Sequence, residues 1–279
     1  MNQLARTLRI GCIQLKVCAN KTENVARALN KIREAKMKGA EIVSLPECFN
    51  SLYGTSYFPE YAEPIPGETT NLLSQIAKEL EIIVIGGTIP ERDGDKLFNT
   101  ATVWGKSGEL LAKYRKMHLF DIDIPNEITF KESDSLTAGN ELAIIDVKDF
   151  KIGLGICYDI RFEELAKLYR KQGCNMLVYP GAFNMKTGPL HWELLARSRA
   201  NDNQLFTALI SPARDVNASY VAYGHSCVID PWGKVLYMAE SDEELFVVDL
   251  ELDVSDKVRS NIPIFSQRRV DVYDTIENK

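Results

Sequence analysis

The sequence predicts an α/β protein in which two β-sheets pack together and helices cover their outer faces. Apolar runs of strand length recur along the whole chain, and several are apolar at nearly every position, which is typical of strands covered on both faces. Segments with helical periodicity lie between these runs in the first part and the middle of the chain, whereas the last third contains mainly strand-like runs.

The predicted strands are the apolar runs themselves. In chain order they cover residues 9–15, 41–46, 82–89, 99–104, 110–114, 142–147, 151–157, 175–183, 205–212, 226–230, 234–239 and 245–250. Helices are predicted where apolar residues recur on one face, as Val25, Leu29 and Ile32 do. On this basis the predicted helices cover residues 22–39, 69–81, 161–173 and 191–200.

No linker rich in Pro, Gly or Ser divides the chain, so we expect one domain over residues 1–279. Its core is expected at about 8–250, followed by a polar C-terminal tail at 251–279. This tail is expected to lie across the surface or along a subunit boundary.

The composition is that of a globular protein, because 45% of the 279 residues are hydrophobic and 26% are charged. A formal net charge of −6 gives no electrostatic signature of nucleic acid binding, so the expected partners are small molecules or further copies of the chain. No apolar stretch reaches membrane-spanning length, and the first residues predict a strand rather than a secretion signal. The six cysteines include no C-x-x-C pair, which argues against a zinc site and suits a reducing cytoplasm.

The segment GLGICYDIRF, residues 153–162, raises the main functional question, because a single cysteine ends an apolar run there. Burial alone would explain Cys157, since free cysteine behaves as a small hydrophobe. However, Cys157 lies where a predicted strand ends and a predicted helix begins, and this edge of a sheet commonly carries the site in α/β proteins. Amide groups at the start of the helix also favour a thiolate or an oxyanion there.

A nucleophilic cysteine needs a base, because an unperturbed thiol is only a few per cent ionised near pH 7. The three histidines are His118, His191 and His225, and spacing alone selects none of them. Glu47 ends another buried-type run in EIVSLPECF, and Lys116 ends a third in LLAKYRKMHLFD. Taken singly, each of these charged residues is best explained as a solvated loop residue.

Taken together, the strings SLPECF, KYRKMHLFD and GICYDIRF resemble the Glu–Lys–Cys signature of the nitrilase superfamily of carbon–nitrogen hydrolases. The resemblance runs from RIGCIQL to SQRRVDVY and includes PGAFN, SPARD and GHSCVIDPWG. It implies an α-β-β-α sandwich with Cys157 as the nucleophile, Glu47 as the general base and Lys116 as the lysine of the signature. The second glutamate of the family falls on Glu132, within ITFKESDSLTAG.

Within the superfamily, the strings LPECFNSLYGTSYFPEYAE, KMHLFDIDIP and TGPLHWELLARSRA are most similar to the omega-amidase group. This similarity implies hydrolysis of the terminal amide of short dicarboxylic acid monoamides, such as 2-oxoglutaramate and 2-oxosuccinamate. The reaction would pass through a thioester and would need no metal and no cofactor. The resemblance also implies a homodimer formed through the helices at 162–173 and 191–200, in the cytoplasm and with a possible mitochondrial pool.

The far end of such a substrate is a carboxylate, and a carboxylate in a confined pocket requires a fixed cation. Arg161 lies four residues beyond Cys157, and its guanidinium could bind the carboxylate through two parallel hydrogen bonds. The alternative for Arg161 is a structural ion pair. Tyr158 is expected to donate its backbone N–H to the oxyanion. The matched motifs offer weaker candidates for the pocket wall, namely Phe120, Phe183, Thr187, His191 and Tyr223.

Three other interpretations stay open. An enzyme of the same fold could act on deaminated glutathione or on N-carbamoyl compounds. A non-catalytic binding protein could use the fold as a scaffold, although all four signature positions are filled. A Cys–His hydrolase could use His118 or His191 as its base.

Overall fold

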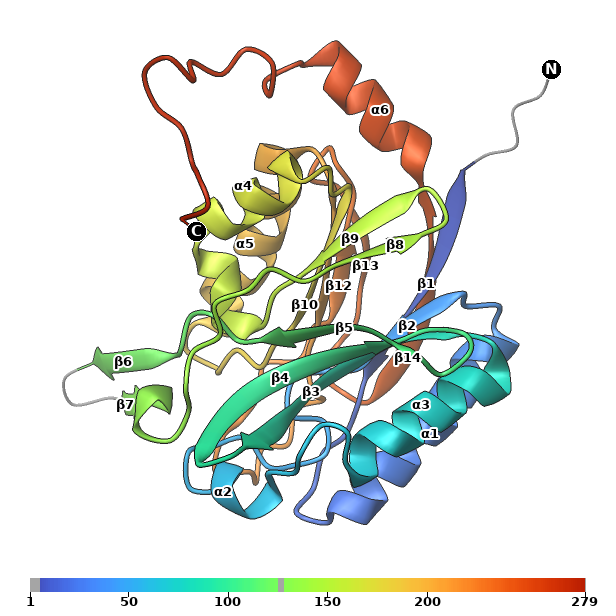
Figure 1. Ribbon diagram of the computed structural model, residues 1–279, viewed down its shortest axis with the longest axis vertical. Coiled ribbons are helices and arrows are strands. Elements are labelled where there is room, and N and C mark those ends of the chain that lie inside the picture. The colour runs from blue at the N-terminus through green and yellow to red at the C-terminus, as the bar shows by residue number, and fades with distance from the viewer. Residues whose placement is uncertain (1–5, 125–127, 279) are drawn as a thin grey trace.

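Figure 1 shows the computed structural model of the protein, which describes residues 6–124 and 128–278. Two six-stranded sheets pack face to face, and helices lie on the outer face of each sheet. The predicted fold class, an α-β-β-α sandwich, is confirmed.

The first sheet has the strand order β14-β1-β2-β3-β4-β5. Its strands are β1 (Thr7–Gln14), β2 (Ile42–Ser44), β3 (Ile83–Asp93), β4 (Lys96–Trp104), β5 (Leu110–Arg115) and β14 (Glu244–Glu251). Strands β1, β2 and β3 run parallel, while β14, β4 and β5 pair with their neighbours in antiparallel fashion.

The second sheet repeats this plan with the order β13-β12-β11-β10-β9-β8. Its strands are β8 (Ile144–Val147), β9 (Phe150–Leu154), β10 (Met176–Pro180), β11 (Phe206–Ile210), β12 (Cys227–Ile229) and β13 (Val235–Met238). Strands β9, β10 and β11 are parallel and the outer strands are antiparallel. The parallel strands end on a common edge, and polar side chains that follow them are therefore brought together.

Strand β1 shows why these runs are apolar at nearly every position. Leu8 and Ile10 belong to the large core between the two sheets, whereas Ile13 belongs to a second core beneath the helices of the first sheet. Successive side chains of a strand point to opposite faces, so a strand covered on both sides needs apolar residues on both.

Helices α1 (Lys21–Met37) and α3 (Glu68–Leu80) cover the first sheet, and α4 (Glu163–Lys171) and α5 (Gly188–Asn203) cover the second. The predicted face of α1 is confirmed, with Val25 and Ile32 buried and Leu29 packed against them. The side chain of Asn20 caps α1 by accepting a hydrogen bond of 3.1 Å from the backbone N–H of Glu23.

Several short elements have no counterpart in the sequence prediction. They are α2 (Phe58–Tyr61), α6 (Leu252–Asn261), the 3₁₀ turns η1 (Glu132–Asp134) and η2 (Cys157–Arg161), and the hairpin β6 (Asp121–Ile124) and β7 (Ile128–Lys131). Helix α6 buries only three of its ten residues, which gives too weak an apolar pattern to predict a helix.

The C-terminal tail beyond α6 returns to the second sheet and lies on the outer surface of α4 of the same chain (Figure 1). Lys171 pairs with Asp274 at 2.8 Å, and the Arg170 guanidinium lies 4.3 Å from the centre of the Phe265 ring. Within one chain, this part of the tail thus lies across the surface of α4.

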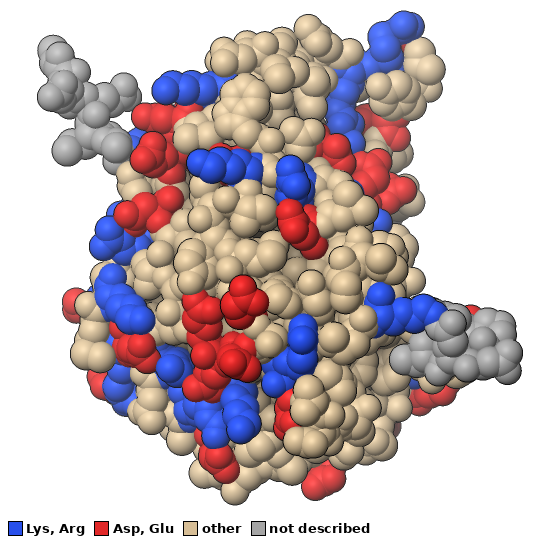
Figure 2. Space-filling view, turned by 180° about the vertical axis from the view of Figure 1, so that it is seen from behind, with Lys and Arg blue, Asp and Glu red and all other residues tan. Residues whose placement is uncertain are grey.

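Charged side chains on the surface of the fold are mixed by sign. In the view from behind, Figure 2 shows acidic and basic groups lying next to one another. Helix α1 illustrates the pattern, because Arg27 pairs with Glu23 and Lys31 pairs with Glu34. Within the described part of the chain, no helix has both the length and the apolar character required to cross a membrane.

Candidate active site

Cys157 begins the turn η2, three residues after β9 ends, and thus lies at the carboxyl edge of the parallel strands as predicted. Its side chain is buried and its backbone is left-handed, with φ at 46°, which is uncommon for a residue other than glycine. The end of β10 passes close by, since a Cβ added to Gly181 would lie 3.1 Å from the Cα of Cys157. A side chain at this position would crowd the backbone of Cys157, so glycine suits the close approach.

Glu47 follows β2 and is fully buried. Its Oε1 atom accepts hydrogen bonds from the Lys116 ammonium at 3.1 Å and from the Asn99 amide at 2.8 Å. Its Oε2 atom accepts from the backbone N–H of Ala182 at 2.8 Å, and its charge acts on the nearby thiol of Cys157. Of the two glutamates in this region, Glu47 acts on the candidate nucleophile more strongly than Glu132 does.

Lys116 follows β5 directly and is fully buried between two carboxylates. Its ammonium lies 2.9 Å from the carboxylate of Glu132, in addition to its contact with Glu47. Glu132 is itself held by the Tyr53 hydroxyl at 2.7 Å and by the backbone N–H of Phe120 at 2.7 Å. The structure therefore brings the four residues of the predicted signature into one buried cluster.

Burial dominates the electrostatics of this cluster. It raises the pKa of the Glu47 carboxyl above its usual value, although Lys116 acts in the opposite direction. Burial also raises the pKa of the Cys157 thiol well above its usual value, and the charge of Glu47 adds to this effect. For Lys116, burial acts to lower the pKa, but Glu132 and Glu47 outweigh it and hold the pKa of the ammonium well above normal. A protonated thiol thus faces a carboxylate base and a permanent cation.

Tyr158 and Arg161, which are expected to bind the oxyanion and the carboxylate of the substrate, lie beside this cluster. The Arg161 guanidinium lies 4.8 Å from the centre of the Phe183 ring and 5.7 Å from that of Tyr158, and its Nη1 is 3.2 Å from Nδ1 of His191. Burial lowers the pKa of Arg161. Among residues 6–124 and 128–278, no carboxylate forms an ion pair with it.

Two of the remaining wall candidates make other contacts. The Thr187 hydroxyl donates to Asn184 at 3.1 Å, and Tyr223 packs against His225 with ring centres 4.3 Å apart. By contrast, Phe120 meets Tyr158 edge to face, with ring centres 5.1 Å apart. Phe120 thus packs against the side chain of Tyr158, whose backbone N–H is the expected oxyanion donor.

The histidines contact other groups than the thiol. His118 stacks on Phe162 and its Nδ1 lies 2.7 Å from Asp159, while His225 approaches the carbonyl of Ala239 at 3.0 Å. The charge of Glu47 acts on the Cys157 thiol, whereas His118 and His225 bind other groups, so the arrangement favours a carboxylate base over the Cys–His alternative.

Sequence reasoning missed four groups of this site. Asn99 and the backbone N–H of Ala182 bind Glu47, Tyr53 binds Glu132, and Asp159 binds the turn that carries Cys157. Asn99 had a signal, because a side-chain amide within a strand that is buried almost throughout requires a partner.

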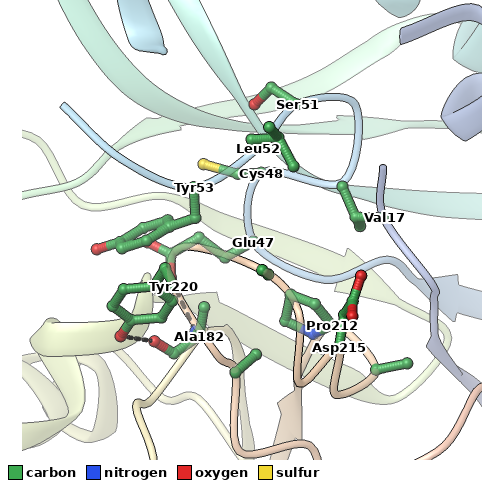
Figure 3. A pocket seen from close by; sticks show the side chains of 13 residues that line it. Val17, Glu47, Cys48, Ser51, Leu52, Tyr53, Ala182, Pro212, Asp215 and Tyr220 are labelled. Atoms are coloured by element: carbon green, nitrogen blue, oxygen red, sulfur yellow. Dashed lines mark hydrogen bonds between the residues drawn. The ribbon is translucent and has the colours of Figure 1, made fainter. Parts of the chain in front are cut away.

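A pocket of about 40 Å³ reaches Glu47 from the side of the loop that follows β11 (Figure 3). Its lining includes Tyr53, Tyr220 and Asp215, and the Tyr220 hydroxyl donates to the carbonyl of Ala182 at 2.5 Å. This volume suffices for a water molecule next to the carboxylate. No group of three or more His, Cys, Asp or Glu side chains among the described residues is placed to hold a metal ion.

Comparison with known proteins extends these observations. The model of the carbon-nitrogen hydrolase family matches residues 9–260. The chain is 56% identical to the omega-amidase NIT2 of Bos taurus over 98% of this chain and 99% of that protein. It is 57% identical to the omega-amidase NIT2 of Homo sapiens, covering 96% and 97% of the two chains.

Among solved structures, Nit3 of Saccharomyces cerevisiae, a member of branch 10 of the nitrilase superfamily, superposes with a TM-score of 0.87 at 42% identity. The superposition covers 94% of this chain and 97% of the yeast chain. The sandwich fold is thus shared, and the chain belongs to the carbon-nitrogen hydrolase family of the nitrilase superfamily, as a hydrolase of carbon–nitrogen bonds.

Proposed function

We propose that the protein is an omega-amidase, which hydrolyses the terminal amide of short dicarboxylic acid monoamides such as 2-oxoglutaramate and 2-oxosuccinamate. The products are the dicarboxylic acid and ammonia. The observation that carries this proposal is Arg161, a half-buried cation near Cys157 with no carboxylate partner among the described residues. The similarity to proteins named omega-amidases supports it.

The reaction begins when Glu47 takes the proton of the Cys157 thiol as the sulfur attacks the amide carbon. The oxyanion of the tetrahedral intermediate is stabilised by the Lys116 ammonium and by the backbone N–H of Tyr158. Glu47 then gives its proton to the leaving nitrogen, the C–N bond breaks, ammonia departs and a thioester remains. In the second half, Glu47 removes a proton from water, hydroxide attacks the thioester, and the C–S bond breaks to release the acid and the thiol.

Glu132 serves this reaction through Lys116. Its carboxylate lies 2.9 Å from the ammonium and is held by Tyr53 and by the backbone of Phe120. An ammonium between two carboxylates keeps its charge, so it is ready to stabilise the oxyanion without prior rearrangement.

Arg161 is assigned to the carboxylate at the far end of the substrate. A charged group in a half-buried position is costly unless it is paired, and the carboxylate of the substrate would supply the missing partner. The rings of Phe183 and Tyr158 lie next to the guanidinium, and a planar guanidinium suits a bidentate carboxylate contact. Phe120, His191, Thr187 and Tyr223 remain proposed members of the pocket wall.

Arg161→Lys tests this assignment, because a point charge cannot replace the planar fork. We expect kcat/KM for 2-oxoglutaramate to fall about 10- to 100-fold, as expected for a lost charged hydrogen bond. A neutral amide should lose much less. The control is Arg33→Lys, on the exposed surface of α1, which should match the wild type with both substrates. Equal losses on the charged and neutral amides would assign Arg161 to the scaffold instead.

One assay of the purified protein distinguishes the two alternatives, namely another class of amide substrate and a non-catalytic binding protein. Ammonia release from a panel of amides, including deaminated glutathione and an N-carbamoyl amino acid, ranks the substrate classes directly. A non-catalytic binding protein would release no ammonia from any of them.

We further propose that the protein acts as a homodimer. The outer face of α5 exposes Leu190 by 65% and Leu194 by 59%, and Trp232, 47% exposed, lies in the same groove. An exposed apolar surface of this kind marks a protein interface, and it lies on one of the two helices expected to pair. Leu194→Glu should convert the dimer into a monomer in light scattering, whereas Met37→Glu on α1 should not. A monomer mass for the wild type at micromolar concentration would contradict the proposal.

The cytoplasm is the proposed location. All six cysteines are free, and unpaired thiols are typical of a reducing compartment. Cell fractionation would test this, and it would also reveal a mitochondrial pool.

A further inference from the structure

The left-handed backbone of Cys157 requires something to hold it. Its φ of 46° is a sparsely populated conformation for a residue with a side chain, and such residues persist only where their surroundings impose them. Gly181 allows the end of β10 to approach, but it makes no hydrogen bond to the turn η2. The hydrogen bonds that define this turn converge on Asp159.

Asp159 is fully buried and closes the turn around Cys157. Its Oδ2 atom accepts from the backbone N–H of Ile156 at 2.8 Å, and its own N–H donates to the carbonyl of Ile156 at 3.0 Å. Ile156, which precedes Cys157, is therefore held by two hydrogen bonds to Asp159.

The same carboxylate also holds the segment that carries Lys116. The Tyr114 hydroxyl donates to Oδ2 at 2.8 Å, the backbone N–H of His118 donates to Oδ1 at 2.9 Å, and the His118 imidazole lies 2.7 Å from Oδ1. Tyr114 and His118 are the residues two positions before and two positions after Lys116. Asp159 thus binds residues on both sides of the lysine and the residue that precedes the cysteine.

We propose that Asp159 is a positioning residue that sets the Cys157 sulfur relative to the Lys116 ammonium. Its four contacts use both lone-pair regions of both oxygens, and an amide in its place would turn an NH₂ group toward donors. Burying a carboxylate costs free energy, because the charge is removed from water. Its presence between two catalytic segments therefore indicates a role in their geometry that an apolar residue could not perform. The proposal rests on the mechanism given above, but not on the identity of the substrate.

The test is Asp159→Asn, with Asp95→Asn in the exposed turn between β3 and β4 as the matched control. The first readout is the rate at which iodoacetamide alkylates Cys157 at neutral pH, followed by mass spectrometry of the peptide that carries it. The second is kcat and KM for any amide that the wild type hydrolyses. A displacement of about 1 Å in a catalytic group costs on the order of 10²-fold, so we expect losses of this size in kcat and in alkylation. KM should change little, because Asp159 touches no substrate.

A merely structural role would lower the melting temperature and leave the alkylation rate of the folded protein unchanged, and that result would overturn the proposal. If Asp159→Asn does not fold, the Tyr114→Phe and His118→Ala variants test the proposal in its place. Each removes one side-chain contact to Asp159 and leaves the carboxylate itself. Alkylation rates equal to the wild type in both would also overturn it. Failure of the wild type to hydrolyse 2-oxoglutaramate would refute the proposed substrate, while the alkylation result would still decide the role of Asp159.

Discussion

Replacing Lys116 by methionine tests the central electrostatic claim, that a fully buried cation stabilises two buried carboxylates. Lys116 is not exposed at all, and its ammonium lies 3.1 Å from Glu47 and 2.9 Å from Glu132. Methionine fills a similar volume but leaves both carboxylates without their counterion. Breaking a buried pair in this way typically costs about 3–5 kcal/mol of unfolding free energy. For a chain of this length the melting temperature should fall by about 2 °C per kcal/mol, and hence by roughly 6–10 °C.

The pH dependence of this loss gives a sharper readout. Lys116 is the main group that opposes the effect of burial on Glu47, so its removal should raise the pKa of that carboxyl further. The folded variant then binds more protons than the unfolded chain, whose glutamate pKa is about 4.3. The slope of the unfolding free energy with pH is therefore negative between the unfolded and folded pKa values. The wild type shares this slope up to its own folded-state pKa, so the deficit of the variant should grow between the Glu47 pKa of the folded wild type and the higher Glu47 pKa of the folded variant.

Thermal unfolding of the wild type and the variant at several pH values from 5 to 8 measures this. Lys113→Met is the control, because Lys113 lies on β5, the strand that Lys116 follows, is 36% exposed and pairs with Glu91. The Lys113→Met variant should lose no more than about 1 kcal/mol of unfolding free energy at any of these pH values. The double variant Lys116→Met with Glu132→Gln should recover part of the stability, since one uncompensated charge is removed. A loss in Lys116→Met that is small, or that does not change with pH, would refute the reasoning.

The remaining predictions concern the chemistry. Cys157→Ala and Cys157→Ser should abolish amide hydrolysis while the protein stays folded, and near-normal turnover in either would rule out the thioester. Glu47→Gln should also abolish activity, because the amide cannot accept the thiol proton. Activity that survives in Glu47→Gln but is lost in His118→Ala would restore the Cys–His alternative. In the wild type, kcat/KM should fall on the acid side with a midpoint above about 4.3, because burial raises the pKa of the Glu47 carboxyl; a midpoint at or below that value would show that the base is solvated.

Sequence by itself determined the layers of this protein and the identity of its central residues. The alternation of two-sided apolar runs with amphipathic segments predicts strands and helices, because burial on both faces or on one stripe leaves a local periodic record. Cys157 at the end of a strand and before a helix could be located in the same way. The assignment of Glu47, Lys116 and Glu132 depended on motif resemblance, since nothing in their spacing indicates that they meet.

Tertiary structure decided everything that depends on contacts between distant segments. Asn99 and the backbone of Ala182 bind Glu47 across 52 and 135 positions of the chain, and no periodic pattern records such a pairing. The absence of a carboxylate beside Arg161, within the part of the chain that is described, could likewise be seen only once the fold was known. The sharing of Asp159 between the cysteine turn and the lysine segment is of the same kind, because hydrogen bonds between loops depend on how the two sheets pack and not on the order of residues within either one.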